Sequence, residues 1–147
     1  MVVFAREFIE TSQNVENLRA KAKVGRMSVE RMGAGPAIPM IYAFMKKKNP
    51  EMEAVLEKEK KFDDIVSKDI IIKGIRDKDP LCMKVVEKFV EIFGVEAGNS
   101  ALKSMPNGGI YLIGGATNGI RDHLLSKDTF WKAFTNKGRL SDVVASF

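Results

Sequence analysis

The chain has 147 residues, of which 45% are hydrophobic, so it is long enough and apolar enough for one segment with a hydrophobic core. Its single cysteine, Cys82, excludes an internal disulfide and is typical of a reducing compartment. No apolar run is long enough to span a bilayer, and charges at Arg6, Glu7 and Glu10 argue against a signal peptide. We therefore expect a cytoplasmic protein without a membrane partner.

The net charge of +5 raises the question of a nucleic-acid partner. Lysine and glutamate are interleaved over residues 51–61, however, which is typical of a solvated helix face. The one local basic run, at residues 46–48, falls at the end of a predicted helix, where cations suit the helix dipole. Because no recognition motif accompanies the charge, we expect no nucleic-acid binding.

Helical signals dominate the rest of the chain, and we treat residues 1–147 as a single segment. The longest helix is predicted to start at Asp79-Pro80, to carry a buried stripe from Val85 to Leu102, and to stop at Pro106. Four other helices are predicted over residues 1–22, 36–48, 50–61 and 68–76, the last with Ser67 as its N-cap. A further helix is predicted from Asp128 or Thr129 through Phe134, and Gly138 is expected to close it. A last short helix is predicted to start at Ser141.

One strand is predicted, at residues 110–113, where Ile-Tyr-Leu-Ile lies between two Gly-Gly pairs. Such a run indicates a buried strand followed by a turn that a ligand can approach closely, or else a tight strand-to-helix turn with no ligand. A lone strand cannot satisfy its backbone hydrogen bonds. We therefore expect this strand to join a sheet formed by chain outside this sequence, and the sequence to be a fragment truncated at both ends. A diverged standalone protein is the alternative.

A second stretch, residues 27–39, reads Met-Ser-Val-Glu-Arg-Met-Gly-Ala-Gly-Pro-Ala-Ile-Pro. Gly35-Pro36 is a helix-entry signal, because proline is tolerated at the first helical position. Glu30 therefore stands just before a glycine-rich helix start, either as a functional carboxylate or as an exposed or capping residue.

Together these stretches resemble the bacterial-type glucokinase family. That family has Ser-Val-Glu-Arg before a Ser-Gly-Pro-Gly turn, then Ala-Gly-Asn-x-x-Leu on a helix that leads into Gly-Gly-Val-Tyr-x-x-Gly-Gly. This chain has Ala-Gly-Asn-Ser-Ala-Leu at 97–102, Phe-Trp-Lys-Ala-Phe at 130–134 and Lys-Gly-Arg at 137–139. The likeness runs in unbroken order over roughly residues 15–147. It implies an α/β fold, mostly helical as given: the C-terminal part of the large domain of an actin-like ATPase (ribonuclease H-like) fold.

The resemblance also implies a site. Glu30 matches the family's sugar-binding glutamate, and a carboxylate can accept hydrogen bonds from two adjacent hydroxyls. Gly114 and Gly115 match the adenosine motif, and Asn118 is a candidate donor to ribose or phosphate, or else a turn-forming residue before Gly119. This chain has Gly33-Ala34-Gly35 where the family usually has a serine before the glycine. For Lys-Gly-Arg at 137–139 we favour a helix cap over a nucleotide contact.

The implied parent protein transfers the γ-phosphate of ATP to glucose with Mg²⁺, as in glycolysis. The expected partners of this chain are glucose, ATP, and the rest of the kinase fold or a homodimer partner. The family's phosphate loops and its catalytic aspartate are absent from this sequence. We therefore expect no catalytic residue here, and no glucose phosphorylation by this chain alone. The alternative is a non-catalytic interaction or scaffold protein derived from a sugar kinase.

The remaining candidates have structural explanations. A single histidine, His123, excludes a His-cluster metal site, and we expect it at the surface. Cys82 is expected to be a core thiol. Core positions are also expected for four aromatic residues, Phe89, Phe93, Trp131 and Phe134.

Overall fold

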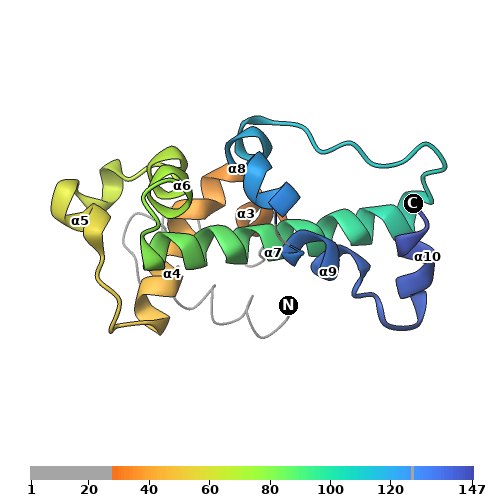
Figure 1. Cartoon of the computed structure of the whole chain (residues 1–147), viewed down its shortest axis with the longest axis horizontal. Coiled ribbons are helices and arrows are strands. Elements are labelled where there is room, and N and C mark those ends of the chain that lie inside the picture. The colour runs from red at the N-terminus through yellow and green to blue at the C-terminus, as the bar shows by residue number, and fades with distance from the viewer. Residues whose placement is uncertain (1–27, 127) are drawn as a thin grey trace.

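The computed structural model describes residues 28–126 and 128–147, so the helix predicted over 1–22 lies outside the described residues. The described part is helical (Figure 1). Its elements are α3 (Glu30–Gly33), η1 (Gly35–Ala37), α4 (Ile38–Lys48), α5 (Val55–Glu59), η2 (Phe62–Asp64), α6 (Ser67–Ile75), α7 (Pro80–Ser104), α8 (Gly115–Ser126), α9 (Thr129–Thr135), η3 (Gly138–Leu140) and α10 (Ser141–Ala145).

Helix α7 runs along the longest dimension of the molecule in Figure 1, and α4, α6 and α9 pack along it. It begins where the sequence predicts: the Asp79 carboxylate accepts a hydrogen bond of 2.7 Å from the Cys82 N–H, and Pro80 occupies the first turn. It ends at Met105, which adopts a left-handed conformation (φ 47°) while its N–H donates to the Ala101 carbonyl.

Two groups of apolar side chains hold the helices together. The larger lies between α4, α6 and the first half of α7, and it buries Cys82, Tyr42 and Phe89, so the predictions for Cys82 and Phe89 are confirmed. The smaller joins the second half of α7 to α9 and α10 through Ala101, Phe134 and Val144. Burial of this kind is the main favourable term in folding.

Close packing of α9 on α7 depends on two glycines of α7. A Cβ added at Gly94 would lie 2.6 Å from the Phe130 carbonyl oxygen, and one at Gly98 would lie 2.3 Å from that of Phe134. No real side chain tolerates such distances, so a larger residue at either position would push the two helices apart. The sequence gives no sign of this requirement.

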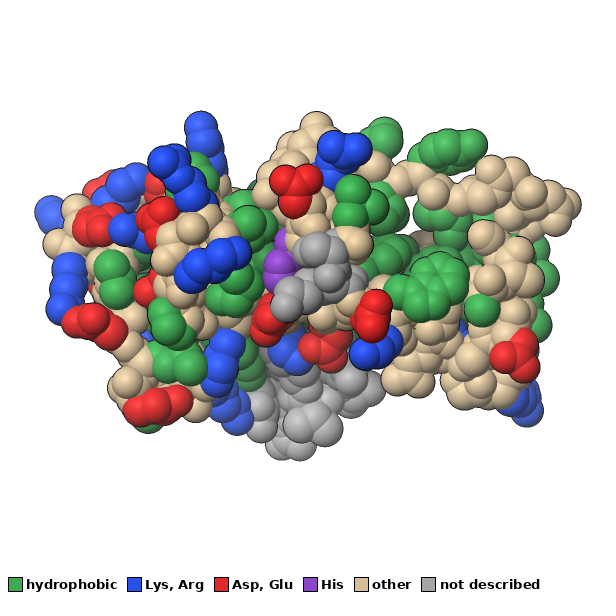
Figure 2. All heavy atoms as spheres, viewed as in Figure 1, with side chains coloured by type: hydrophobic (Ala, Val, Ile, Leu, Met, Phe, Trp, Pro, Cys, Tyr) green, Lys and Arg blue, Asp and Glu red, His purple; other side chains and the backbone are tan. Residues whose placement is uncertain are grey.

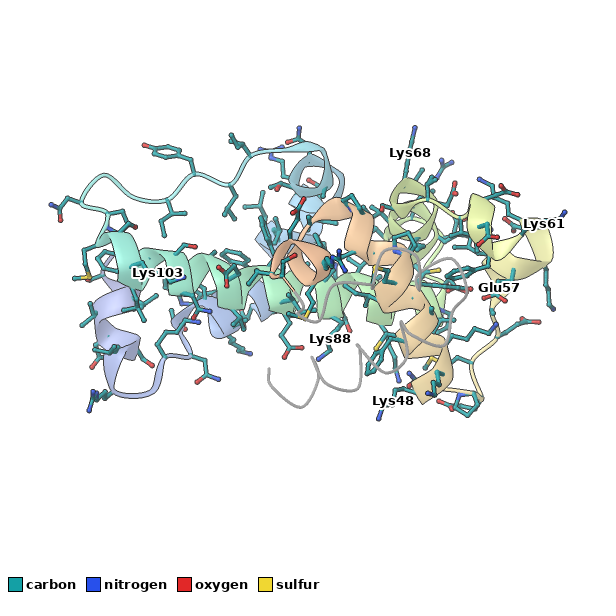
Figure 3. The ribbon with its side chains drawn as sticks, turned by 180° about the vertical axis from the view of Figure 1, so that it is seen from behind. Lys48, Glu57, Lys61, Lys68, Lys88 and Lys103 are labelled. Carbon is teal, nitrogen blue, oxygen red and sulfur yellow. The ribbon has the colours of Figure 1, made fainter. Side chains whose placement is uncertain are left out.

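Charges of both signs are mixed over α5 and α6, at the left of Figure 2. Figure 3 shows Lys61 and Lys68 pointing away from these helices. Three ion pairs tie α5 and its C-cap Lys60 to neighbouring helices: Lys46–Glu57 at 2.6 Å, Lys60–Asp69 at 2.8 Å and Lys73–Glu59 at 2.7 Å. In the described ranges no helix is long and apolar enough to cross a membrane.

The predicted strand at 110–113 is not formed. The segment between α7 and α8 leaves α7 as an extended connection without regular structure (Figure 1), and the part of the chain that the structure describes contains no strand. The physical reason is the one that makes a lone strand unstable: no neighbouring strand is there to accept and donate its backbone hydrogen bonds.

Smaller corrections concern helix ends. The helix predicted from Pro50 starts only at Val55, because the intervening residues form a turn in which the Met52 N–H donates to the Asn49 carbonyl. Val66, not Ser67, is the N-cap of α6. Asn136 rather than Gly138 ends α9.

Three side-chain predictions also need correction. His123 is buried on α8 (5% exposed) instead of lying at the surface, and Trp131 is 52% exposed instead of buried. Phe93 is only half-buried. The exposed Trp131 ring still stacks on the buried Phe134 ring, with centroids 5.5 Å apart.

Candidate functional site

Glu30 opens the short helix α3 and is exposed. The first turn of a helix favours a carboxylate because its free N–H groups carry partial positive charge. The glycine-rich stretch after it forms two successive turns: Ala34 is extended (φ −100°, ψ 161°) and separates α3 from η1, and Pro36 lies in η1 just ahead of α4. The predicted helix entry is thus confirmed, with a short helical turn before it.

A groove of about 430 Å³ lies beside Glu30, between α3, the second half of α7 and the extended connection. Its wall is largely apolar, with two carboxylates, Glu30 and Glu96, and two hydroxyl groups from α7, Ser100 and Ser104. The other lining residues are Val29, Gly33, Ala34, Phe93, Ala97, Ala101, Pro106, Gly109, Ile110 and Leu112. Sequence reasoning did not single out Glu96, because it falls on the polar side of a helix pattern otherwise explained by burial.

Gly114 and Gly115 stand at the start of α8. Gly114 has φ 122°, a conformation that favours glycine, so its identity has a purely local reason. Gly115 has no such constraint, and a Cβ added there would meet nothing within 4 Å. The outer side of this turn is therefore open, which is the property that a close-approaching ligand requires.

Asn118 is exposed on the first turn of α8, where its N–H donates to the Gly114 carbonyl at 3.0 Å. It is a helical residue and not part of a turn before Gly119. Gly119 instead packs against α6: a Cβ added there would lie 3.5 Å from Ile71 Cδ1.

The two glycine-rich stretches meet in the structure. A Cβ added at Gly35 would lie 3.5 Å from the Cβ of Ala116, so the turn that follows Glu30 lies against the first turn of α8. The groove that Glu30 lines does not include Gly114, Gly115 or Asn118. The turns that carry the candidate sugar and adenosine residues thus lie side by side, but the candidate residues face different spaces.

Lys137 has a structural role. Its Nζ donates to the Val95 carbonyl at 2.8 Å and to Asn99 Oδ1 at 2.9 Å, both on α7. Burial lowers the pKa of the Lys137 ammonium below its ordinary value, because desolvation disfavours the charged form. Gly138, the next residue, has φ 57° and allows the turn into η3. The structure thus gives Lys137 and Gly138 structural roles, although Gly138 does not close α9 as predicted.

No group of three or more His, Cys, Asp or Glu side chains within 28–126 and 128–147 is arranged to hold a metal ion. The carboxylates nearest the candidate site, Glu30 and Glu96, line an apolar wall. In addition, Glu96 Oε2 accepts a hydrogen bond of 3.3 Å from Asn99.

Comparison with known proteins identifies the family. The family model described as Glucokinase matches residues 2–147. The glucokinase of Synechocystis sp. is 33% identical over 146 residues, which cover 91% of this chain and 41% of that protein. The glucokinase of Nostoc punctiforme is 31% identical over 141 residues (87% and 40%), and that of Caulobacter sp. 33% over 129 residues (87% and 36%).

The chain belongs to the glucokinase family, as the motifs at 27–39, 97–102 and 108–115 predict. It spans about two fifths of the length of the curated relatives it matches.

Proposed function

We propose that this chain is the sugar- and adenosine-binding part of a glucokinase, which transfers the γ-phosphate of ATP to glucose and serves glycolysis in the cytoplasm. The observation that carries the proposal is the close approach of Gly35 to Ala116, which brings the turn after Glu30 beside the start of α8. Phosphoryl transfer depends on fixing acceptor and donor relative to one another, so binding elements that lie side by side are what the reaction needs.

In this proposal Glu30 binds glucose. Its carboxylate is exposed at the rim of the groove and can accept hydrogen bonds from two neighbouring sugar hydroxyls at once. The apolar wall formed by Phe93 and Ala97 suits the less polar face of a pyranose ring.

The adenosine part of ATP lies against Gly114 and Gly115, whose outer side is open, and the exposed amide of Asn118, on the first turn of α8, donates to ribose or phosphate. Magnesium, the phosphate loops and the catalytic aspartate belong to the remainder of the parent kinase. The chain alone is therefore proposed to bind but not to phosphorylate glucose.

The remainder also has to supply a sheet, as in an actin-like ATPase fold. Ile110 and Leu112 line the groove, whereas Tyr111 and Ile113 are 84% and 86% exposed. This alternation is that of a strand, and apolar residues on both faces are typical of a strand covered on both sides. Apart from the bond that Ile113 accepts from Thr117 Oγ1, the described residues give this segment no hydrogen bonds.

The test is a chimera in which residues 2–147 replace the matching part of the Synechocystis glucokinase. We expect glucose-dependent formation of ADP by the chimera and none by the isolated chain. Glu30→Gln should raise the KM for glucose by about tenfold or more, since hydrogen bonds to a charged group contribute roughly 1.5–3 kcal/mol. Glu51→Gln, an exposed carboxylate away from the groove, is the matched control.

A folded chimera that neither binds nor phosphorylates glucose would overturn the proposal. It would favour the second candidate, a non-catalytic interaction protein. The exposed apolar pair Tyr111 and Ile113 is the observation that supports this second function.

A further inference from the structure

The hydroxyl of Ser67, at the start of α6, is used across the fold and not within its own helix. Ser67 Oγ donates a hydrogen bond of 2.7 Å to the carbonyl oxygen of Gly35, which is 32 residues away in the chain. The N-terminus of α6 is held by another group, since the Asp69 carboxylate accepts the Val66 N–H at 3.1 Å. The contact with Gly35 therefore does not follow from helix capping.

Gly35 is the point where three elements meet. Its carbonyl accepts the Ile38 N–H as well as the Ser67 hydroxyl, which uses both of its lone pairs. On another side it lies against Ala116 of α8. Only Ala34 separates it from the end of α3, so a displacement of Gly35 is transmitted to the helix that carries Glu30.

Helix α6 contacts α8 through the same face. Ile71 lies one turn after Ser67, and in a helix residues four apart lie on one face. Ile71 is 8% exposed and packs against Gly119 of α8. One face of α6 thus contacts both the turn after Glu30 and the helix that starts at Gly115.

We propose that Ser67 is a positioning residue: by fixing the Gly35 carbonyl it sets the position of Glu30 relative to the first turn of α8, and thereby the affinity for the sugar. This inference rests on the proposed function for its kinetic consequence. Its structural part, the fixing of the turn, is independent of that function.

The kinetic test uses the chimera with the Synechocystis glucokinase. Ser67→Ala should raise the KM for glucose by about threefold to tenfold, the effect of one hydrogen bond, with a smaller change in kcat. Ser67→Thr keeps the hydroxyl and should restore the KM. Ser146→Ala is the matched control, because its hydroxyl also donates to a backbone carbonyl at 2.7 Å, but locally, to Val143.

A Ser67→Ala chimera with the glucose KM of the Ser146→Ala chimera would overturn the inference. So would a fall in kcat that tracks a lowered melting temperature while the KM for glucose stays unchanged, since this indicates loss of folded protein alone.

The structural test uses the isolated chain and needs no activity. Hydrogen exchange should be faster in Ser67→Ala at the amides of Ile38, which donates to Gly35, and Ala34, which donates to the Glu30 carbonyl at 3.1 Å. Unchanged protection at both amides would refute the fixing of the turn. If the unsubstituted chimera fails to phosphorylate glucose while these amides respond, the proposed function fails and the role of Ser67 in the turn stands.

Discussion

Lys137 Nζ lies 2.9 Å from Asn99 Oδ1, which joins the turn after α9 to the second half of α7. Each residue belongs to a motif that marks the family, Ala-Gly-Asn at 97–99 and Lys-Gly-Arg at 137–139. The stem of Lys137 completes the link, since a Cβ at Gly98 would lie 2.5 Å from Lys137 Cε. Packing of α9 on α7 therefore explains Gly98, Asn99 and Lys137 without a ligand.

This relationship predicts the effect of Lys137→Met. Methionine keeps the stem that packs on Gly98 but removes the hydrogen bonds that Lys137 donates to Asn99 Oδ1 and to the Val95 carbonyl. We expect a loss of about 1–3 kcal/mol in the free energy of unfolding of the isolated chain, measured by urea denaturation.

Lys132→Met is the control for this prediction. The Lys132 side chain is 77% exposed and pairs with Asp128 at 3.4 Å, a surface ion pair of little energetic value. It should change the free energy of unfolding by less than about 0.5 kcal/mol. Equal effects of the two substitutions would show that the Lys137–Asn99 contact does not stabilise the fold.

The sequence predicts the elements whose causes are local. Asp79 and Pro80 mark the start of α7 because an N-cap carboxylate and a proline in the first turn act within a few residues. The helix entry at Gly35-Pro36 is predicted for the same reason. The end of α9 is an exception. Its C-cap is Asn136, and Gly138, which was expected to close it, instead begins η3 two residues further on.

Features with distant causes are either not predicted by the sequence or predicted wrongly. The strand at 110–113 has the right residues but no partner among the described residues, and pairing is not a local property. The burial of His123 and the exposure of Trp131 depend on how α8 and α9 are rotated against their neighbours, which composition does not reveal. The hydrogen bond from Ser67 to Gly35 connects segments that no sequence motif relates.

Some residues of the candidate site can be predicted from the sequence, and others depend on the three-dimensional arrangement of the chain. Glu30 and Gly115 were singled out by family motifs, and the structure adds that their turns meet at Gly35 and Ala116. The groove and the second carboxylate on it, Glu96, could not be predicted, because they arise from the path of the extended connection beside α7.

Tyr42 offers a prediction on stability. Its ring is fully buried between α4 and α7, and its hydroxyl has no hydrogen-bond partner among the described residues. An unsatisfied buried hydroxyl is costly, so Tyr42→Phe should raise the free energy of unfolding at pH 7 by about 1 kcal/mol in urea denaturation. A loss of more than about 0.5 kcal/mol would contradict this prediction.

The same substitution should change the dependence on alkaline pH. Burial raises the pKa of Tyr42 well above its ordinary value of 10.0. Above about pH 10 the unfolded chain releases this proton while the folded chain keeps it, so stability falls as the pH rises. Tyr42→Phe should remove that part of the loss between pH 7 and 10.5. Tyr111→Phe, at a side chain that is 84% exposed, should leave stability at pH 7 unchanged.

Ile113 tests whether the segment at 110–113 becomes a covered strand in the parent kinase. The side chain is 86% exposed here, so Ile113→Asp should leave the stability of the isolated chain within about 0.5 kcal/mol. In the chimera the same aspartate would be buried on the sheet, where a carboxylate without a partner is costly, and the loss should be at least about 2 kcal/mol. Leu125→Asp, at a side chain of α8 that is 74% exposed, is the control and should be tolerated in both proteins.

The difference in stability loss between the isolated chain and the chimera decides the question, because a residue that stayed in solvent would respond equally in both. Equal, small effects of Ile113→Asp would show that the remainder of the kinase does not cover this segment, and its four apolar residues would then need another partner.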